Sequence, residues 1–104
     1  AAITYMLGGN FNQIANTIIN TLANTSGIIC DGAKPSCAAK ISSALDAALL
    51  AHTMSMHDDV FHADEGIVKD DLEKTIRAVG YIGREGMKST DIEVLNIMID
   101  KVCP

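Results

Sequence analysis

Two cysteines on either side of a short loop are the residues of this sequence best suited to chemistry. Cys30 and Cys37 lie seven positions apart, with Gly32 and Pro35 between them. Glycine can adopt the positive φ with which a loop folds around a compact object, and Pro35 suits the first turn of a following helix. Cys37 then lies at a helix N-terminus, where the dipole favours the thiolate, and Lys34 adds a positive charge. The pattern indicates a pair of ligands for a soft metal centre.

The same spacing leaves other interpretations open. Two cysteines in a chain of this size are often just small, buried apolar side chains. A disulfide is disfavoured in the cytoplasm, where thiols stay reduced. Zinc normally takes four ligands, and the paired cysteine signature of zinc sites is missing. From spacing alone, a metal-binding role and a structural role for the cysteines both remain possible.

Several other polar residues are candidates for binding a substrate or a metal. Asn10 and Asn12 stand at a predicted helix start, where N–H groups could receive a substrate carboxylate, although capping explains Asn10 equally well. Ser26 lies in the polar turn just before the cysteine loop. Cys103, one residue from the end, is interpreted as an incidental thiol on a fraying terminus. Its alternative role is a tail ligand that caps an open metal position.

Two further segments are expected to be structural. The stretch from His57 to Glu65 is rich in potential metal ligands, but its histidine spacing places the rings on no shared helical face. It is interpreted as a solvated acidic loop, with an active-site lid as the alternative. Gly80, Gly83 and Gly86 lack a preceding strand, so they are interpreted as helix-packing or capping residues rather than a phosphate loop.

Composition limits the classes of protein that this chain can represent. Its 104 residues are 48% hydrophobic and 20% charged, which is typical of one folded domain. A net charge of -5 without clustered Lys and Arg disfavours nucleic acid and anionic membranes as partners. No uncharged apolar run is long enough to span a membrane, and no secretory signal is recognisable. A cytoplasmic location is the default expectation.

Hydrophobic periodicity predicts an all-α fold, a compact bundle of about four main helices preceded by an N-terminal helical stub. The first main helix begins at Asn10, which forms a capping-box match with Gln13, and ends in the turn 24–27. The second runs from Pro35 to about Met54, and its many Ala and Ser residues allow close packing. It is expected to be the central helix.

The second half of the chain is predicted to contain a loop and two more helices. The loop covers residues 55–66, and helical periodicity returns with Leu72. The last helix is expected to begin after Thr90, which matches a second capping box with Glu93. Its predicted buried residues are Ile92, Leu95, Met98, Ile99 and Val102.

The start of the chain suggests that it is part of a longer protein. It opens on Ala1 without an initiator Met, and residues 1–7 look like the last turns of a helix that began earlier. Residues 1–104 are therefore interpreted as a single C-terminal helical domain of a larger protein, and any site in the domain can be incomplete.

Three stretches of this sequence resemble a known family. They are Leu7-Gly8-Gly9-Asn10, the run from Ile28 to Ala38 that contains both cysteines, and Glu65-Gly66-Ile67. Together they resemble the L-cysteine desulfidase family, which is related to the alpha chain of bacterial iron–sulfur L-serine dehydratase. The resemblance extends over about residues 5–100.

The resemblance implies a cofactor and its ligands. Members of the family are implied to bind a 4Fe–4S cluster through three cysteines, two of them at positions matching Cys30 and Cys37. The third cysteine and the cysteine proposed as catalytic base lie upstream of this chain. No catalytic residue is therefore expected within residues 1–104, and the isolated fragment is expected to lack the cluster.

The implied activity is a lyase reaction without pyridoxal phosphate. L-Cysteine or L-serine would undergo β-elimination, giving pyruvate, ammonia and sulfide or water. The short cysteine loop favours cysteine, since serine dehydratases have a longer loop at this position. The expected partners are the amino-acid substrate, the missing N-terminal part of the same protein and, with the oligomeric state open, further copies. The alternative is a non-enzymatic helical interaction domain with structural cysteines.

Overall fold

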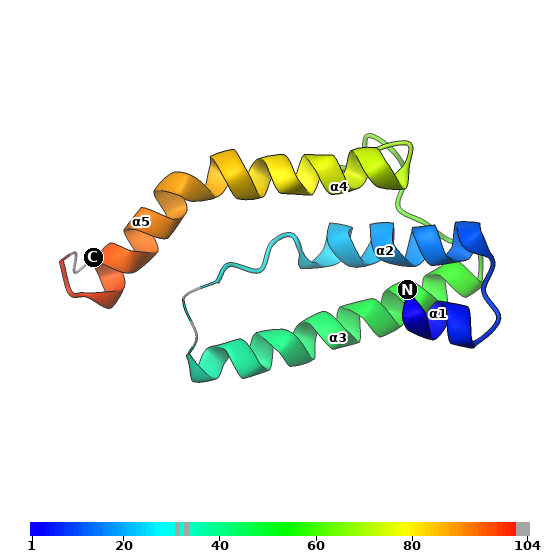
Figure 1. The fold of residues 1–104 in the computed structure, drawn as a ribbon, viewed down its shortest axis with the longest axis horizontal. Coiled ribbons are helices and arrows are strands. Elements are labelled where there is room, and N and C mark those ends of the chain that lie inside the picture. Colours follow the sequence, from blue (N-terminus) through cyan, green and yellow to red (C-terminus); the bar gives the residue numbers. More distant parts are fainter. Residues whose placement is uncertain (31, 33, 102–104) are drawn as a thin grey trace.

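Helices make up the framework of the chain in the computed structural model, which describes residues 1–30, 32 and 34–101 (Figure 1). The helices are α1 (Ala2–Met6), α2 (Phe11–Thr25), α3 (Pro35–Met56), α4 (Leu72–Tyr81) and α5 (Met87–Met98), with a π-helical turn (Ile82–Gly86) between the last two. No strand occurs in these described ranges. The predicted all-α class, with four main helices and an N-terminal stub, is confirmed.

Local sequence signals set the ends of the first helices as predicted. Gln13 donates its backbone N–H to Asn10 Oδ1, and Asn10 donates its own to Gln13 Oε1, both at 2.9 Å. This capping box satisfies two backbone donors that a helix start leaves open. Pro35 occupies the first turn of α3, where its missing N–H costs nothing.

The centre of the molecule is the contact between α2 and α3, which α1 covers at one end (Figure 1). Few apolar side chains are buried there: the buried hydrophobic residues in the described part of the chain are Ile19, Ala47, Ala51 and Val68. Ala51 is 1% exposed, and its small side chain lets the neighbouring helices approach closely. The prediction that α3 is the central helix is wrong: among the described helices, α2 packs on α1, α3 and α4, whereas α3 packs on α1 and α2 (Figure 1). The reason is that α4 returns along α2 and not along α3.

Buried hydroxyl groups fill much of the space that apolar side chains would otherwise occupy. Thr4 of α1, Thr17 of α2 and Ser55 of α3 are each at most 2% exposed and form hydrogen bonds with one another. Gly9 allows this packing, because a Cβ there would lie 2.5 Å from the Thr4 side chain. Gly9 is therefore required for a close approach, whereas the preceding Gly8 has a positive φ of 86°.

The structure corrects the predicted ends of two helices. α3 continues to Met56, so Ser55 is a buried helical residue rather than the start of a loop. α5 begins at Met87, not after Thr90, because the π-helical turn carries the helix on from α4 without a break. The Thr90 hydroxyl consequently donates to the Gly86 carbonyl at 3.4 Å, a bond within the helix, and makes no cap.

The predicted buried face of the last helix is also wrong. Ile92, Leu95, Met98 and Ile99 are 43–59% exposed, and no residue of α5 is buried. The physical reason is that α5 extends beyond the α2–α3 pair and packs on neither of these helices (Figure 1). Val102 lies outside the described residues.

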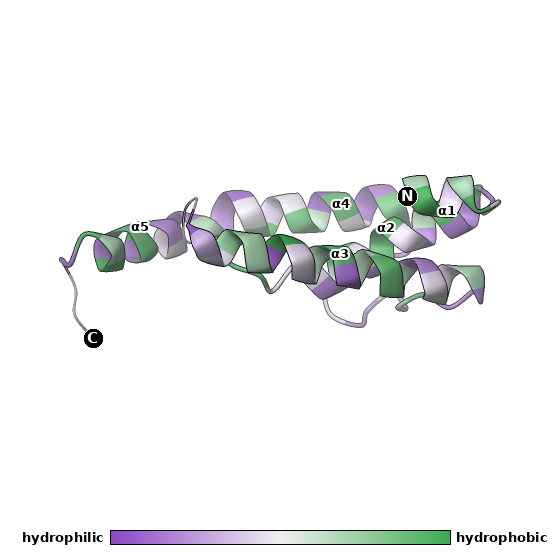
Figure 2. Cartoon of the chain, turned by 90° about the horizontal axis from the view of Figure 1, so that it is seen from below, coloured by the Kyte–Doolittle hydropathy of each residue, from purple (hydrophilic) through white to green (hydrophobic). Residues whose placement is uncertain are grey.

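Large apolar side chains are consequently exposed on several helices. Figure 2 shows hydrophobic residues coloured green along α1, α3 and α5. Phe11, Met6 and Ile41 are among the most exposed, at 80%, 79% and 71%. Such a surface is typical of a domain that another protein surface covers. In the described part of the chain, no helix combines the length and the apolarity needed to cross a membrane.

Asn20 fastens the long segment after α3 to α2. The Asn20 amide donates to the Asp59 carbonyl at 3.1 Å, and its Oδ1 accepts from the Phe61 backbone N–H at 3.0 Å. Asn20 is 1% exposed, so both bonds are shielded from water. One side chain on α2 therefore holds the loop that leads to α4.

We expect Asn20→Ala to lower the free energy of unfolding by about 1–3 kcal/mol, because it leaves two backbone groups of the loop unpaired. Asn24→Ala is the matched control, since the Asn24 side chain is exposed on the same helix and should change stability little. Urea unfolding measures both variants. Equal stability of the two would show that Asn20 does not hold the loop.

Candidate functional site

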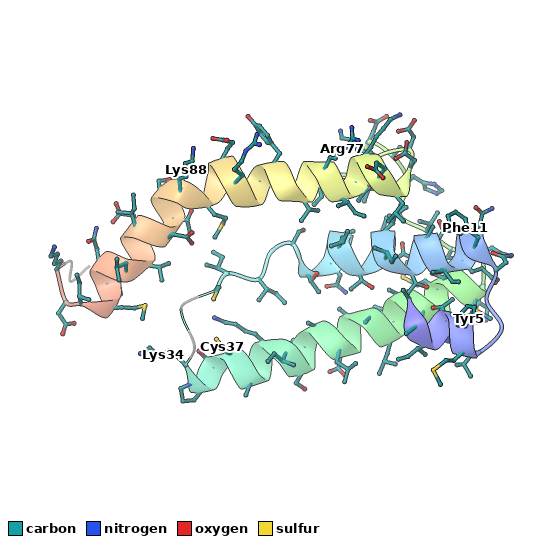
Figure 3. The ribbon with its side chains drawn as sticks, viewed as in Figure 1. Tyr5, Phe11, Lys34, Cys37, Arg77 and Lys88 are labelled. Atoms are coloured by element: carbon teal, nitrogen blue, oxygen red, sulfur yellow. The ribbon has the colours of Figure 1, made fainter. Side chains whose placement is uncertain are left out.

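The two cysteines of the loop lie at the same end of the molecule. Cys30 belongs to the segment between α2 and α3, and Cys37, labelled in Figure 3, belongs to the first turn of α3. Neither cysteine is in a disulfide, and both line one shallow hollow of about 250 Å³. The other residues around this hollow are Ile28, Ile29, Lys40, Ile41 and Ala44. The structure thus brings the predicted ligand pair together beside a lysine.

A hydrogen bond determines the present state of Cys37. Its thiol donates to the Gly32 carbonyl at 2.7 Å, and the Lys34 backbone N–H donates to the same oxygen at 2.8 Å. Gly32 has a φ of +88°, which confirms the predicted use of glycine to turn the loop. Because only a protonated thiol can donate, Cys37 gives up this bond if it becomes a thiolate ligand.

The described residues supply only part of a metal-ligand set. Among them, no group of three or more His, Cys, Asp or Glu side chains is placed to hold a metal ion. Cys103, the candidate tail ligand, lies outside the described residues. Two thiols with a helix N-terminus and a lysine nearby suit a soft, anionic cluster, but a cluster needs further ligands from elsewhere.

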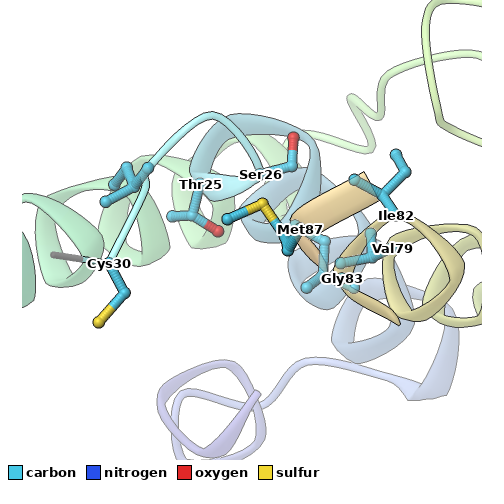
Figure 4. A pocket seen from close by; sticks show the side chains of 9 residues that line it. Thr25, Ser26, Cys30, Val79, Ile82, Gly83 and Met87 are labelled. Atoms are coloured by element: carbon cyan, nitrogen blue, oxygen red, sulfur yellow. The ribbon is translucent and has the colours of Figure 1, made fainter. Parts of the chain in front are cut away.

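A second hollow, of about 280 Å³, lies on the other side of Cys30 (Figure 4). Thr25 and Ser26 at the end of α2 form one wall, and Ile82 and Gly83 of the π-helical turn form the opposite wall. The sequence indicated Ser26 but not the contribution of the π-helical turn. The sequence carries no signal for this wall, although π-helical turns are rare and are often found at functional sites.

Asn10 and Asn12 do not share this region. They lie at the opposite end of α2, about 20 Å from its C-terminus at 1.5 Å per residue. Asn12 lines a hollow together with Asp70, Asp71 and Glu73. This acidic surrounding disfavours binding of a substrate carboxylate, and Asn10 is occupied by its capping box.

The acidic wall of that hollow is partly neutralised by Lys74. Its ammonium group lies 2.9 Å from the Asp70 carboxylate, and this hydrogen bond lowers the pKa of Asp70. Both side chains are more than half exposed, so the pair contributes little to stability. The charged groups at this end of the molecule are therefore those of an exposed helix start.

The segment from His57 to Glu65 forms an ordered loop. Asp58 and Asp64 have positive φ values of 57° and 72°, and Glu65 accepts a 2.8 Å hydrogen bond from the His62 backbone N–H. His57 Nδ1 is paired with the Thr53 carbonyl at 2.8 Å. Glu65 and His57 thus bond to the backbone near them.

Comparison with known proteins places this geometry in a family. The family model described as serine dehydratase alpha chain matches residues 1–96. A protein of Treponema denticola named UPF0597 protein is 56% identical over 99 residues, which cover 95% of this chain. Proteins of the same name from Lachnoclostridium phytofermentans and Finegoldia magna are 55% and 52% identical over 96% and 97% of the chain. No solved structure matches the chain.

The chain therefore belongs to the serine dehydratase alpha chain family. It spans about a quarter of the length of the curated relatives that it matches, since the aligned parts cover 23–24% of those proteins. The family match includes both cysteines, the loop between them and the whole α2–α3 pair.

We expect iodoacetamide to alkylate Cys30 several-fold faster than Cys37 in the metal-free chain. Cys30 is exposed, whereas Cys37 is partly buried and its thiol is held by the Gly32 carbonyl. Peptide mapping by mass spectrometry separates these two sites from Cys103. Faster modification of Cys37 would contradict the hydrogen bond seen in the structure.

Proposed function

We propose that this chain is the C-terminal, cluster-bearing helical domain of a longer iron–sulfur lyase that acts on L-cysteine or L-serine. The reaction is β-elimination to pyruvate, ammonia and sulfide or water. Membership of the serine dehydratase alpha chain family supports a lyase subunit of this type. The single observation that carries the proposal to this site is the shared hollow of Cys30 and Cys37.

Cys30 and Cys37 would hold a 4Fe–4S cluster, with the remaining ligand supplied by the rest of the protein. Two thiols in one hollow, neither of them in a disulfide, fit this group, because clusters are held by cysteine thiolates. Deprotonation of Cys37 removes its hydrogen bond to the Gly32 carbonyl, which keeps the Lys34 N–H as donor. The α3 N-terminus and Lys40 would stabilise the thiolate charge. Cys103 is an incidental tail thiol in this proposal, and a ligand that caps the open iron is its alternative role.

When bound, such a cluster supplies an open iron that acts as a Lewis acid on the substrate leaving group. The residues of this chain contribute binding rather than proton transfer. Cys30 links the ligand hollow to the hollow beside Ser26, where Thr25 and Ser26 offer hydroxyl groups and Ile82 offers apolar surface. A small amino acid with a thiol or hydroxyl side chain matches that mixture of groups. The base that removes the α-proton belongs to the remainder of the protein.

The deciding experiment uses the full-length protein that contains this chain, reconstituted anaerobically with iron and sulfide. Release of sulfide or pyruvate together with visible cluster absorbance supports the lyase. The exposed apolar side chains favour one rival, a non-enzymatic interaction domain. A colourless, inactive protein would support the rival. Comparing kcat/KM for L-cysteine and L-serine identifies the preferred substrate.

We expect Cys37→Ser in the full-length protein to abolish cluster retention and catalysis together, because a hydroxyl is a harder and far less acidic ligand than a thiolate. Folding should survive, since the partly buried Cys37 contributes little to the core. Cys103→Ser is the control: turnover should continue. Iron content, visible absorbance and sulfide release are measured for each variant. Full activity of Cys37→Ser would remove the basis of the assignment.

Residues 1–104 alone should show no turnover of L-cysteine or L-serine. The described residues provide only two thiol ligands in one hollow and no group of three potential metal ligands. Sulfide and pyruvate assays on the purified chain after anaerobic reconstitution test this. Turnover at the rate of the full-length protein would show that the site is complete within this chain.

A further inference from the structure

A line of buried polar groups crosses the contact between α1, α2 and α3. The Oγ1 atoms of Thr4 and Thr17 are 2.8 Å apart, and Thr17 Oγ1 lies 2.9 Å from Ser55 Oγ. At one end of the line, the imidazole Nδ1 of His52 lies 2.9 Å from Thr4 Oγ1. These groups are the most buried polar cluster of the described fold and play no part in the cysteine site.

Two backbone carbonyls also contact the line, one at its other end and one at its middle hydroxyl group. Ser55 Oγ is 2.8 Å from the Ala51 carbonyl, and Thr17 Oγ1 is 2.9 Å from the Gln13 carbonyl. A carbonyl can only accept a hydrogen bond, and each hydroxyl has one proton to donate. The three hydroxyls therefore cannot fill all five of these short contacts.

The position of the histidine proton decides how many contacts are filled. If the proton is on Nε2, Nδ1 must accept from Thr4, and two of the five contacts hold no proton. If it is on Nδ1, His52 donates to Thr4, Thr4 to Thr17, Thr17 to Ser55, and Ser55 to the Ala51 carbonyl. Only the contact with the Gln13 carbonyl is then empty. Because unpaired buried polar groups are costly, the Nδ1–H tautomer is favoured.

This arrangement leaves a lone pair on His52 Nε2. The line ends on a carbonyl that cannot take up a proton, so it fixes the tautomer and does not conduct protons. Nε2 makes no hydrogen bond with the described residues. Since no fully buried side-chain nitrogen or oxygen among them lacks a partner, Nε2 of the partly buried ring reaches the surface.

We propose that His52 is a binding residue whose Nε2 accepts a hydrogen bond from an N–H or O–H group in the N-terminal remainder of the longer protein. This rests on the proposed function only in requiring that remainder. The helix that carries Thr4 also exposes Tyr5, labelled in Figure 3, and Met6, at 73% and 79%. An oriented acceptor in a domain that exposes large apolar side chains suits a covering protein segment better than a free ion.

The tautomer is tested by nitrogen NMR on the full-length protein labelled with ¹⁵N-histidine, in which His52→Asn identifies the signal. The wild type should show His52 with its proton on Nδ1. Thr17→Val leaves Thr4 no acceptor other than Nδ1, so it should shift His52 toward the Nε2–H form. Ser55→Ala should not, because Thr17 can then donate to the Gln13 carbonyl. An Nε2–H signal in the wild type overturns the proposal, even if Thr17→Val fails to fold.

The accepted hydrogen bond is tested by acylation of the same protein with diethyl pyrocarbonate, which attacks an unprotonated, accessible imidazole nitrogen. His57 and His62 are exposed and act as internal references. A bound donor should make His52 react about tenfold more slowly than these references. Reaction at the reference rate would show that Nε2 is uncovered and would overturn the binding role. Iron content of the same sample reports separately on Cys30 and Cys37.

Discussion

The hydrogen-bonded contact of Thr4, Thr17 and Ser55 is the constraint on which the rest of this fold depends. It joins α1, α2 and α3 at one place, where the apolar residues that could do so are few and small. Hydrogen bonds are directional, so they fix how far each helix slides along its neighbour, but each adds only about 1 kcal/mol of net stability. The interior of this domain therefore specifies alignment strongly, while much of its apolar surface is left for contacts outside the domain.

The parts of the fold that the sequence predicted are those set by local chemistry. Asn10 with Gln13 and Pro35 define helix starts within a few residues of themselves, and the structure confirms both. The errors arose where contacts between distant parts of the chain decide which residues are helical or buried. Ser55 looked like a loop residue because hydroxyl groups usually face water, and its burial depends on two helices far away in sequence. Thr90 matched a cap, but the preceding helix continued through it.

The candidate site also has features that local sequence sets and features that tertiary packing sets. Cys30 and Cys37 lie at the two ends of a loop that Gly32 turns with a positive φ, so local residues bring them to a common hollow. The wall opposite Ser26 could not be predicted, because it comes from a π-helical turn more than fifty residues later in the chain. Likewise, Asn12 acquired acidic neighbours only when α4 returned beside α2. Sequence patterns identified the candidate site residues, and tertiary packing determined which groups surround them.

The π-helical turn Ile82–Gly86 joins α4 and α5 into one continuous helix. An α-helix rotates by about 100° and advances about 1.5 Å for each residue, so deleting one residue of α5 before Ile92 would swing Ile92 and Leu95 around the helix axis by that angle. A π-helical turn takes up one extra residue within a helix, so a deletion there that restores regular α-helical winding would leave both side chains facing nearly the same way. The junction between α4 and α5 is therefore the place on this long helix where the chain can lose a residue without changing the face that α5 presents.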